Sequence, residues 1–309
     1  MAQAAVLAYL ALVVDEPEVS AARLEKDFGL PRRNFKCGGS TVPVIAVGAT
    51  ALALFGQADP FLGPNPKKGL HHLALCAADP EAAARAAGLP IAGNLAYGLD
   101  DKAQISLAAQ ASGGIRVRFT EPLGLAPARS DIVERIDHIG VASADNRAAR
   151  AAFIENLGCV YESEQTDSEV ETIAENFTSD THQTIFHTRA SRLVGSMRVT
   201  FITVGDCEIE FLQDLTTGVS ADPARHDARG DTRADRSVIA RHIAARGAGL
   251  HHLAFKTPDI DAALGRLGRA GYRMIDTVGR PGSRRARIGF LHPDALGGVL
   301  VHFVEREAL

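Results

Sequence analysis

The chain has 309 residues, of which 46% are hydrophobic and 6% aromatic. This length is sufficient for one large domain or two medium-sized domains, each with its own core. A net charge of -4 and an isoelectric point near 6.3 exclude binding driven by bulk attraction to nucleic acid or to anionic membranes, so we expect neither partner.

The cysteines and the N-terminus favour a cytoplasmic protein. The four cysteines are scattered and form no CxxC motif, which is typical of a reducing compartment where thiols serve as small core residues. Residues 1–14 are apolar and contain no basic n-region, and acidic residues follow them. This favours a buried strand over a signal peptide. No stretch approaches the roughly 18 apolar residues of a membrane span.

An internal repeat organises the chain. The segment 249–255 reads GLHHLAF, and the segment 69–75 reads GLHHLAL. Four similar units follow one another, each with an apolar strand, a turn containing Asp or Asn, an Ala-rich amphipathic helix and further strands. Because one such unit has no second surface on which to bury its sheet, we expect the units to pair.

The first two units have clear boundaries. The first is predicted to contain strands at 8–14, 42–47 and 50–55 and a helix at 18–28. The second is predicted to contain strands at 70–76, 104–109 and 115–119 and a helix at 80–87. Gly29 and Gly88 end the two helices. The proline-containing segments 56–68 and 121–130 are predicted linkers, and the second is the expected domain boundary.

The last two units repeat this order. The third is predicted to contain strands at 136–141, 199–204 and 208–212 and a helix at 147–156. The fourth is predicted to contain strands at 251–255, 287–291 and 298–304 and a helix at 259–270. Apolar residues alternate along the closing strands of the fourth unit, as in half-buried strands.

Two polar segments enlarge the third unit. Residues 163–193 are rich in Ser, Thr, Glu and His, and we interpret them as an insertion loop or a lid over the barrel. His182 and His187 in this segment are candidate proton carriers, with a solvated loop as the alternative. Residues 216–236 contain many aspartates and arginines and are predicted to be a mobile surface loop, followed by a short helix at 237–245.

These elements predict an α+β fold. Four βαβββ modules would pair into two tandem half-open barrels with the helices outside. We place the N-terminal domain at residues 1–125 and the C-terminal domain at residues 131–309.

In this arrangement the chain resembles the vicinal oxygen chelate superfamily, which includes glyoxalase I, methylmalonyl-CoA epimerase, the extradiol ring-cleaving dioxygenases and 4-hydroxyphenylpyruvate dioxygenase. The resemblance covers essentially the whole chain. Its most specific segments are IDHIGV at 136–141, GLHHLA at 249–254, and FLHP at 290–293 followed by GGVLV at 297–301. The last two are most similar to the epimerase, whereas a degenerate domain before an active one is more similar to the ring-cleaving dioxygenases.

The resemblance implies two interior metal positions in each unit, one on the first strand and one on the last. Alignment of the units places these residues there in the C-terminal domain: His138, Glu210, His252 and His302. In the N-terminal domain it places there Tyr9, Leu54, His72 and Arg118. We therefore expect a metal site in the C-terminal domain and none in the N-terminal domain. His251 and His292 are expected to lie in loops or face outward.

Three imidazoles and one carboxylate suit a divalent Fe, Zn, Ni, Co or Mn ion. If the ion is octahedral, two adjacent positions stay open for neighbouring oxygens of a small substrate such as a hydroxyketone, an enediolate or a catechol. Glu210 is the only carboxylate of the set, and the resemblance to glyoxalases implies that it is the catalytic base. The family usually has glutamate where this chain has His302, which departs from the ligand sets of its epimerases and dioxygenases.

Cationic side chains are candidates for binding a carboxylate or phosphate group of the substrate. Arg198, Arg287 and His187 are the predicted substrate-binding residues. Solvated strand edges are the alternative interpretation of the arginines.

The sequence thus favours a metal-dependent enzyme, similar to glyoxalases and epimerases, that transfers a proton as an isomerase or a lyase. The first alternative is a non-haem iron dioxygenase that cleaves a ring or acts on a 2-oxo acid. The second is a small-molecule binding protein without catalysis. The Ala-rich helices of the N-terminal domain, such as 82–87, suit a scaffold or a homodimer surface.

Overall fold

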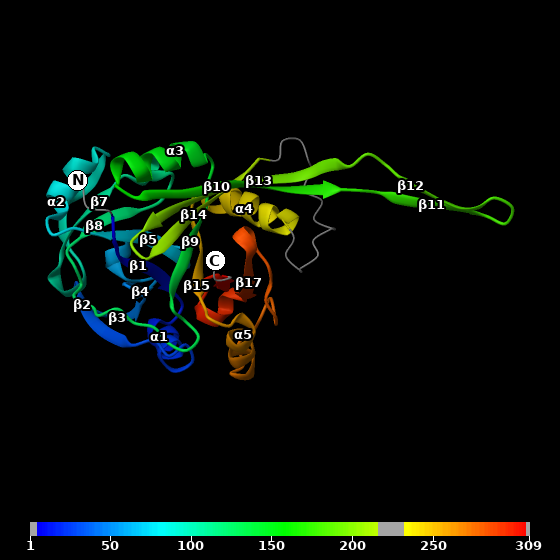
Figure 1. Ribbon diagram of the computed structural model, residues 1–309. Coiled ribbons are helices and arrows are strands. Elements are labelled where there is room, and N and C mark those ends of the chain that lie inside the picture. Colours follow the sequence, from blue (N-terminus) through cyan, green and yellow to red (C-terminus); the bar gives the residue numbers. More distant parts are fainter. Residues whose placement is uncertain (1–4, 216–231, 307–309) are drawn as a thin grey trace.

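The computed structural model of the chain describes residues 5–215 and 232–306. It confirms the predicted α+β fold: two eight-stranded sheets, each curled into a half-open barrel, carry fewer helices than strands (Figure 1). Within the described residues, no helix is both long enough and apolar enough to cross a membrane.

The first sheet contains the strands of the first two units in the order β2-β3-β4-β1-β5-β8-β7-β6. Its strands are β1 (Leu7–Val14), β2 (Arg32–Cys37), β3 (Ser40–Val47), β4 (Thr50–Gly56), β5 (Gly69–Cys76), β6 (Ile91–Tyr97), β7 (Ala103–Leu107) and β8 (Val117–Thr120). Its helices are α1 (Pro17–Lys26) and α2 (Pro80–Ala87). The central strands β1 and β5 are antiparallel, and each has a parallel outer neighbour, β4 and β8 respectively.

The second sheet repeats this plan in the order β10-β13-β14-β9-β15-β18-β17-β16. Its strands are β9 (Arg135–Ala142), β10 (Val160–Glu171), β13 (Arg192–Val204), β14 (Cys207–Asp214), β15 (Gly249–Lys256), β16 (Arg280–Pro281), β17 (Ala286–Leu291) and β18 (Val301–Arg306). Its helices are α3 (Asn146–Ala151), which continues as a π-helical turn (Ala152–Asn156), α4 (Thr232–Arg246) and α5 (Ile260–Arg269). The central pair β9 and β15 is again antiparallel, with β14 and β18 as parallel neighbours.

The turns that contain aspartate start three of the helices. Asp79 accepts a hydrogen bond from the backbone N–H of Ala82 at 2.9 Å, and Asp259 accepts one from Ala262 at the same distance. Asp145 caps α3 in the same way. These caps satisfy backbone donors that have no partner inside the helix, so the repeated turn defines where each helix begins.

The two sheets share a large core that lies between them and their helices. Phe28, which follows α1, contacts Phe255 of β15 at 5.8 Å and Phe303 of β18 at 5.9 Å between ring centroids. The segment 121–134 connects the sheets, and we propose that the boundary between the domains at 1–125 and 131–309 falls within it.

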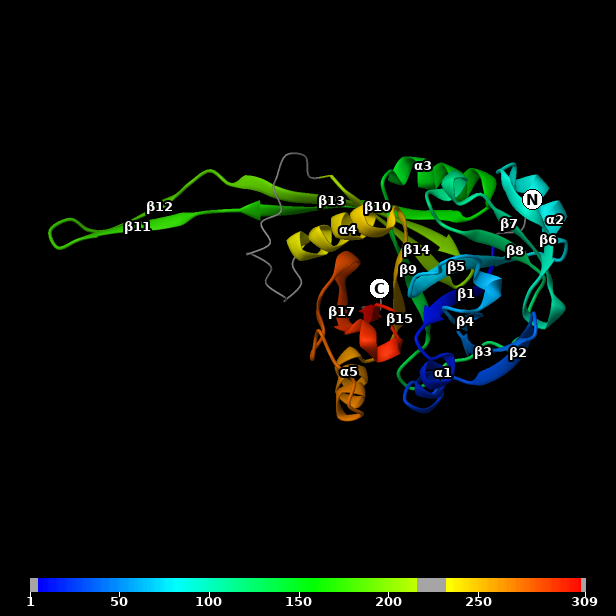
Figure 2. The ribbon, with the colours of Figure 1, turned by 180° about the vertical axis from the view of Figure 1, so that it is seen from behind.

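The prediction of an insertion loop or lid at residues 163–193 is wrong. These residues form a long β-hairpin: β10 pairs with β13, and farther out β11 (Ala174–Ser179) pairs with β12 (Gln183–Thr188). Figures 1 and 2 show it extending away from both barrels. Both faces of β11 and β12 are largely exposed. In β10 exposed and half-buried residues alternate, but the half-buried ones, such as Gln165 and Asp167, are polar, so the sequence lacks the apolar alternation that marks a half-buried strand.

Besides β10, three further edge strands have no counterpart in the predicted elements: β2, β6 and β16. Two of these, β2 and β6, are polar or exposed along most of their length, and β16 has only 2 residues. The predicted mobile loop at 216–236 lies mostly outside the described residues. The helix predicted at 237–245 lies within α4.

Candidate metal centre

Four neighbouring strands of the second sheet bring the predicted ligands together. His138 lies on β9, Glu210 on β14, His252 on β15 and His302 on β18, and these strands are consecutive in the sheet. All four side chains are buried. Because alternate residues of a strand face the same side, one inward-facing residue from each strand is enough to form the cluster.

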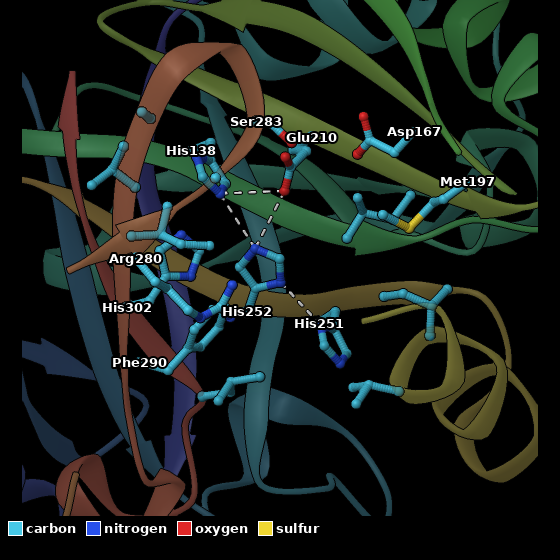
Figure 3. A pocket seen from close by; sticks show the side chains of 18 of the residues that line it. His138, Asp167, Met197, Glu210, His251, His252, Arg280, Ser283, Phe290 and His302 are labelled. Carbon is cyan, nitrogen blue, oxygen red and sulfur yellow. Dashed lines mark hydrogen bonds and ion pairs between the residues drawn. The ribbon is translucent and has the colours of Figure 1, made fainter. Parts of the chain in front are cut away.

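The ligand atoms of the three histidines lie within 4.8 Å of one another, and the carboxylate of Glu210 lies close to two of them (Figure 3). Glu210 Oε2 is 3.3 Å from His138 Nε2 and 3.4 Å from His252 Nε2, and the two imidazole nitrogens are 3.3 Å apart. One nitrogen of His302 lies within 4.8 Å of a nitrogen of each of the other two histidines. The structure therefore brings together all four residues that the repeat alignment selected.

A glycine provides the space for one of these rings. Gly140 of β9 lies opposite both Glu210 and His252 in the sheet. A Cβ atom at this position would lie 2.1 Å from Cε1 of His252. Any other residue at 140 would displace the ring, so the glycine is part of the local design of the cluster.

The hydrogen bonding of His302 fits a metal ligand. Its side chain is 3% exposed, and neither ring nitrogen has a hydrogen-bond partner among the described residues. A buried imidazole without a partner costs free energy because it loses its hydrogen bonds to water. A divalent cation between three imidazoles and a carboxylate would bind one of the two nitrogens of His302, so the residues present suit such an ion.

An acidic residue behind His138 orients its ring. Asp137 is fully buried, and its Oδ1 lies 2.8 Å from His138 Nδ1. Arg306 donates from Nε to the other oxygen of Asp137 at 2.8 Å. Burial alone would raise the pKa of Asp137, but the hydrogen bonds to His138 and Arg306 hold it well below its usual range. The carboxylate fixes Nδ1 as the protonated nitrogen and leaves the lone pair of Nε2 available to bind a metal ion.

Burial and neighbouring charges together set the protonation state of each residue in the cluster. Burial disfavours the imidazolium of His138, but Glu210 and Asp137 raise its pKa overall. Burial also opposes ionisation of Glu210, yet the neighbouring His138 and His252 lower its pKa overall. Burial lowers the pKa of His252 and places that of His302 well below 6.5. Both rings are therefore neutral and can offer a nitrogen lone pair to a metal ion.

His251 lies on strand β15 and lines the same cavity as the cluster, so the prediction that it lies in a loop or faces outward is wrong. His292 lies in the loop after β17, as predicted, and also borders this cavity. The register of β15 against β9 shifts between Leu250 and His252, and this bulge turns His251 toward the cavity. His251 Nδ1 lies 3.0 Å from His252 Nδ1, and its ring packs 4.8 Å from that of His242 of α4.

The cavity in front of the cluster has a volume of about 900 Å³. Much of its wall is apolar or aromatic, including Met197, Phe201, Ile239 and Phe290. Arg284 also borders it, above the ring of Phe201 at 3.5 Å and ion-paired with Glu208. A cavity of this size that combines apolar walls with polar and charged side chains suits an organic molecule with polar substituents.

Asp167 is a cavity residue that the sequence did not reveal. It lies on β10 at the base of the hairpin, half-buried, and accepts a hydrogen bond from Gln165 Nε2 at 2.8 Å. Burial raises its pKa, and the negative charge of Glu210 adds to this effect. Since β10 was taken for a loop, no alternation was available to place this carboxyl group in the barrel.

The three predicted substrate-binding residues do not line the cavity. Arg198 lies on β13, where it pairs with Glu164 at 3.6 Å. Arg287 lies on β17 and donates to Asp261 at 2.6 Å. His187 is exposed on β12, far out on the hairpin.

The interior of the first barrel is filled instead of open. Tyr9, His72 and Arg118 correspond to His138, His252 and His302, and His72 Nε2 lies 3.2 Å from the hydroxyl of Tyr9. Apolar side chains pack around them, and the ring of Phe61, between β4 and β5, lies 4.5 Å from the guanidinium group of Arg118.

The predicted interior position of Leu54 is wrong by one residue. Its neighbours Ala53 and Phe55 belong to the interior cluster, whereas Leu54 packs in the large shared core. Because successive side chains of a strand face opposite sides, an alignment shift of one residue exchanges the two faces.

Known proteins are similar to this chain over all or part of its length. An uncharacterized protein of Bacillus subtilis, YqjC, is 24% identical over 173 residues, which is 56% of this chain and 93% of that protein. An ethylmalonyl-CoA/methylmalonyl-CoA epimerase of Cereibacter sphaeroides is 26% identical over 173 residues, or 55% and 96% of the two chains. A mutant 4-hydroxymandelate synthase from Streptomyces coelicolor has the same two-barrel fold, with a TM-score of 0.64 at 15% identity over 99% of this chain and 94% of that one.

A family profile identifies the part of the chain that carries the cluster. Residues 137–290 match the profile of the Glyoxalase/Bleomycin resistance protein/Dioxygenase superfamily. The matched range includes His138, Glu210 and His252 together with the strands that hold them. On the profile match and the repeated strand order of its two sheets, the chain belongs to the vicinal oxygen chelate superfamily.

Proposed function

We propose that this protein is a divalent-metal-dependent enzyme that binds neighbouring oxygens of a small substrate and catalyses proton transfer, as an isomerase or a lyase. The observation that carries the proposal is the buried set His138, Glu210, His252 and His302, which meets at the wall of a cavity of about 900 Å³. These residues would hold the ion, and a bound Fe, Zn, Ni, Co or Mn ion would supply Lewis-acid stabilisation of negative charge on the substrate oxygens.

Glu210 is the proposed base. Its pKa is lowered by the neighbouring imidazoles despite burial, so the carboxylate is ionised at neutral pH. Its side chain lies at the cavity wall, where a substrate carbon beside a carbonyl group can approach it. A substrate that displaces water from the cavity would strengthen the interaction between the carboxylate and the acidic C–H group.

Asp167 is the proposed second proton carrier. Isomerisation requires that a proton removed from one position returns to another, or to the other face of the same carbon. A carboxyl group with a raised pKa holds its proton at a higher pH than an ordinary aspartic acid, which suits a group that returns a proton. Asp167 lines the same cavity as Glu210, on a different strand.

The similarity to a relative named as an epimerase supports the isomerase form of the proposal. Substitution of histidine at 302 for the family's usual glutamate leaves Glu210 as the single carboxylate of the cluster. The proposed division of labour between Glu210 and Asp167 accounts for two proton carriers with this altered ligand set.

The first test is elemental analysis of the protein purified without added metal. We expect about one equivalent of a divalent metal, lost in His252→Ala. The matched control is His72→Ala, which removes the corresponding histidine of the first barrel and should leave the metal content unchanged. Deuterium exchange into acyl-CoA esters and 2-hydroxyketones then tests proton transfer, and Glu210→Gln should abolish it.

Other outcomes of the same experiments contradict the proposal. Iron together with substrate-dependent oxygen consumption would identify a dioxygenase instead. Absence of metal even after reconstitution would refute the four-ligand site and favour a binding protein without catalysis.

A further inference from the structure

The outer part of the hairpin, residues 170–193, forms an arm that stands clear of both barrels (Figures 1 and 2). It has six large apolar side chains that are more than one third exposed: Val170, Ile173, Phe177, Ile185, Phe186 and Leu193. Phe186 is the most exposed of them at 78%. An isolated two-stranded ribbon is marginally stable in water, and exposed apolar clusters mark interaction sites. The arm therefore has the properties of a docking element.

The apolar side chains lie on both faces of the arm. Phe177 and Ile185 are directly opposite each other on β11 and β12, so they share one face. Phe186 follows Ile185 on β12 and therefore points to the other face. The sequence of β12, QTIFHT, contains no Asp, Glu, Lys, Arg or Pro. Isolated strand edges usually carry such residues to prevent pairing with another chain, so this strand lacks the usual protection.

A second unprotected strand lies at the far end of the molecule. β6 is the edge strand of the first sheet, and all seven of its residues are exposed. Its sequence, IAGNLAY, also contains no charged residue and no proline. Ile91, Leu95 and Tyr97 are its large apolar side chains, and Tyr97 is 65% exposed. Together, the arm and β6 carry nine of the fifteen exposed large apolar side chains of the described residues.

The two surfaces do not meet within one copy of the chain. Both views show the arm projecting on one side of the molecule and β6 on the opposite side. The arm extends roughly 40 Å from the cavity wall, at about 3.4 Å per residue of strand. A second copy of the chain, in contrast, supplies a free β6 edge for each arm.

We propose that this protein forms a twofold dimer in which β12 of each arm adds as an extra strand to the β6 edge of the other copy. Pairing of two uncharged strands would satisfy exposed backbone groups without burying an unpaired charge. Each copy contributes the 6 residues of β12 and the 7 residues of β6 to the two contacts, and the neighbouring residues of the arm extend this surface towards the roughly 20–30 residues per side of a standard interface. Twofold symmetry forms the contact twice, once for each arm.

The arm that makes the proposed contact is continuous with the cavity wall. The base of the arm contributes Thr166, Asp167 and Ser168 to the cavity of its own copy. An arm held at its outer end by a second copy would restrict the motion of this wall. The oligomeric state and the candidate metal centre are nevertheless tested separately.

Native mass spectrometry and light scattering test the dimer with two double variants and one single control variant. The arm variant is Ile185→Ser with Phe186→Ser, and the edge variant is Leu95→Ser with Tyr97→Ser. The control is Val278→Ser, which removes an apolar side chain that is 64% exposed and lies on neither surface. We expect wild type and control to have twice the chain mass of 32.7 kDa, and each double variant to have the mass of one chain.

Mixing the two double variants gives the decisive measurement. The arm variant retains an intact β6 and the edge variant retains an intact arm, so one of the two contacts can form. We expect a heterodimer in the mixture, which also shows that neither variant has failed to fold. A monomeric wild type would overturn the proposal. A dimer that persists in the arm variant would do so as well, and a dimer that persists in the edge variant would indicate that the arms pair with each other.

Discussion

Asp137 and Arg306 form a two-point ion pair directly behind the ring of His138. Arg306 donates from Nε and Nη2 to the two carboxylate oxygens of Asp137, at 2.8 and 2.5 Å. The Oδ1 atom of the same carboxylate accepts a hydrogen bond from Nδ1 of His138. Of these three residues, only His138 belongs to the ligand cluster, so the pair acts on the metal site by orienting one ligand.

The first prediction follows from this geometry. Asp137→Asn should lower the affinity for a divalent metal about 10- to 100-fold, because the ring of His138 loses the acceptor that fixes its tautomer. Competition between the protein and a chromogenic chelator for Zn or Co measures this affinity directly. The control is Asp261→Asn, an exposed aspartate bonded to Arg287 on the other side of the domain. Equal affinities of Asp137→Asn and wild type would contradict the proposed role.

A second prediction concerns the partnerless ring of His302. His302→Phe should raise the thermal unfolding midpoint of the metal-free protein, because a buried polar group without a partner is replaced by an apolar ring. The same variant should lose bound metal. His72→Phe is the control: its ring is bonded to Tyr9 and His71, so removal leaves other groups without partners and should lower the midpoint.

Calorimetry of the two variants after chelator treatment tests this difference. A lower midpoint for His302→Phe would show that the ring is already satisfied in the metal-free protein. The cluster would then resemble an ordinary buried histidine group, and its interpretation as a metal centre would lose its strongest structural support.

A third prediction uses the close approach of Gly140 to His252. Gly140→Ala places a methyl group where the ring now lies, and the expected results are loss of metal and a lower free energy of unfolding. The control is Gly268→Ala in α5, where nothing lies within 4 Å of the added group. This substitution should stabilise the helix by about 0.5–1 kcal/mol. Metal content and urea unfolding of both variants provide the measurement, and a Gly140→Ala variant with full metal content would contradict the prediction.

Much of the fold could be predicted because the repeat is marked by local signals. Aspartates before the helices act as caps in the structure, and Gly29 and Gly88, which follow helices, have the positive φ expected there. The failures lie where such signals are absent. The arm was taken for a loop because a ribbon exposed on both faces has no apolar face, and Leu54 was placed on the wrong side because strand periodicity turns an error of one residue into a change of face.

The four cluster residues could be found from sequence because they occupy equivalent positions in repeated strands. His251 could not, since the bulge in β15 reverses its direction without any signal in residue type. Asp167 could not either, because the enlarged third unit has no equivalent strand length in the other units with which to align it. Both residues depend on backbone geometry that only the assembled sheet provides.

Asp167 gives a fourth prediction, on activity and stability together. Its raised pKa means that the folded state favours the neutral carboxyl group. Its contribution to stability is therefore present below the ordinary pKa of 3.8 and lost as pH rises through the raised value. Asp167→Asn should unfold at a higher temperature than wild type at neutral pH, and this difference should vanish on acidification. Proton-transfer activity should fall about 100-fold or more.

The control for this prediction is Asp180→Asn, an exposed aspartate at the tip of the arm. It should leave both activity and the pH dependence of unfolding unchanged. A fully active Asp167→Asn variant would exclude the residue as a proton carrier, whatever its effect on stability.

The fifth prediction concerns acid sensitivity at His242 of α4, whose ring packs against that of His251. Burial lowers the pKa of His242 from 6.5 to about 4, and the positive charges of Arg246 and Lys67 add to the effect. The folded state thus favours neutral His242, so its contribution to stability is complete above pH 6.5 and is lost as pH falls toward about 4. His242→Gln should reduce the loss of unfolding free energy across this interval, measured by urea unfolding at several pH values. His182→Gln on the exposed arm is the matched control, and parallel pH profiles for His242→Gln and wild type would show that acid destabilisation originates elsewhere.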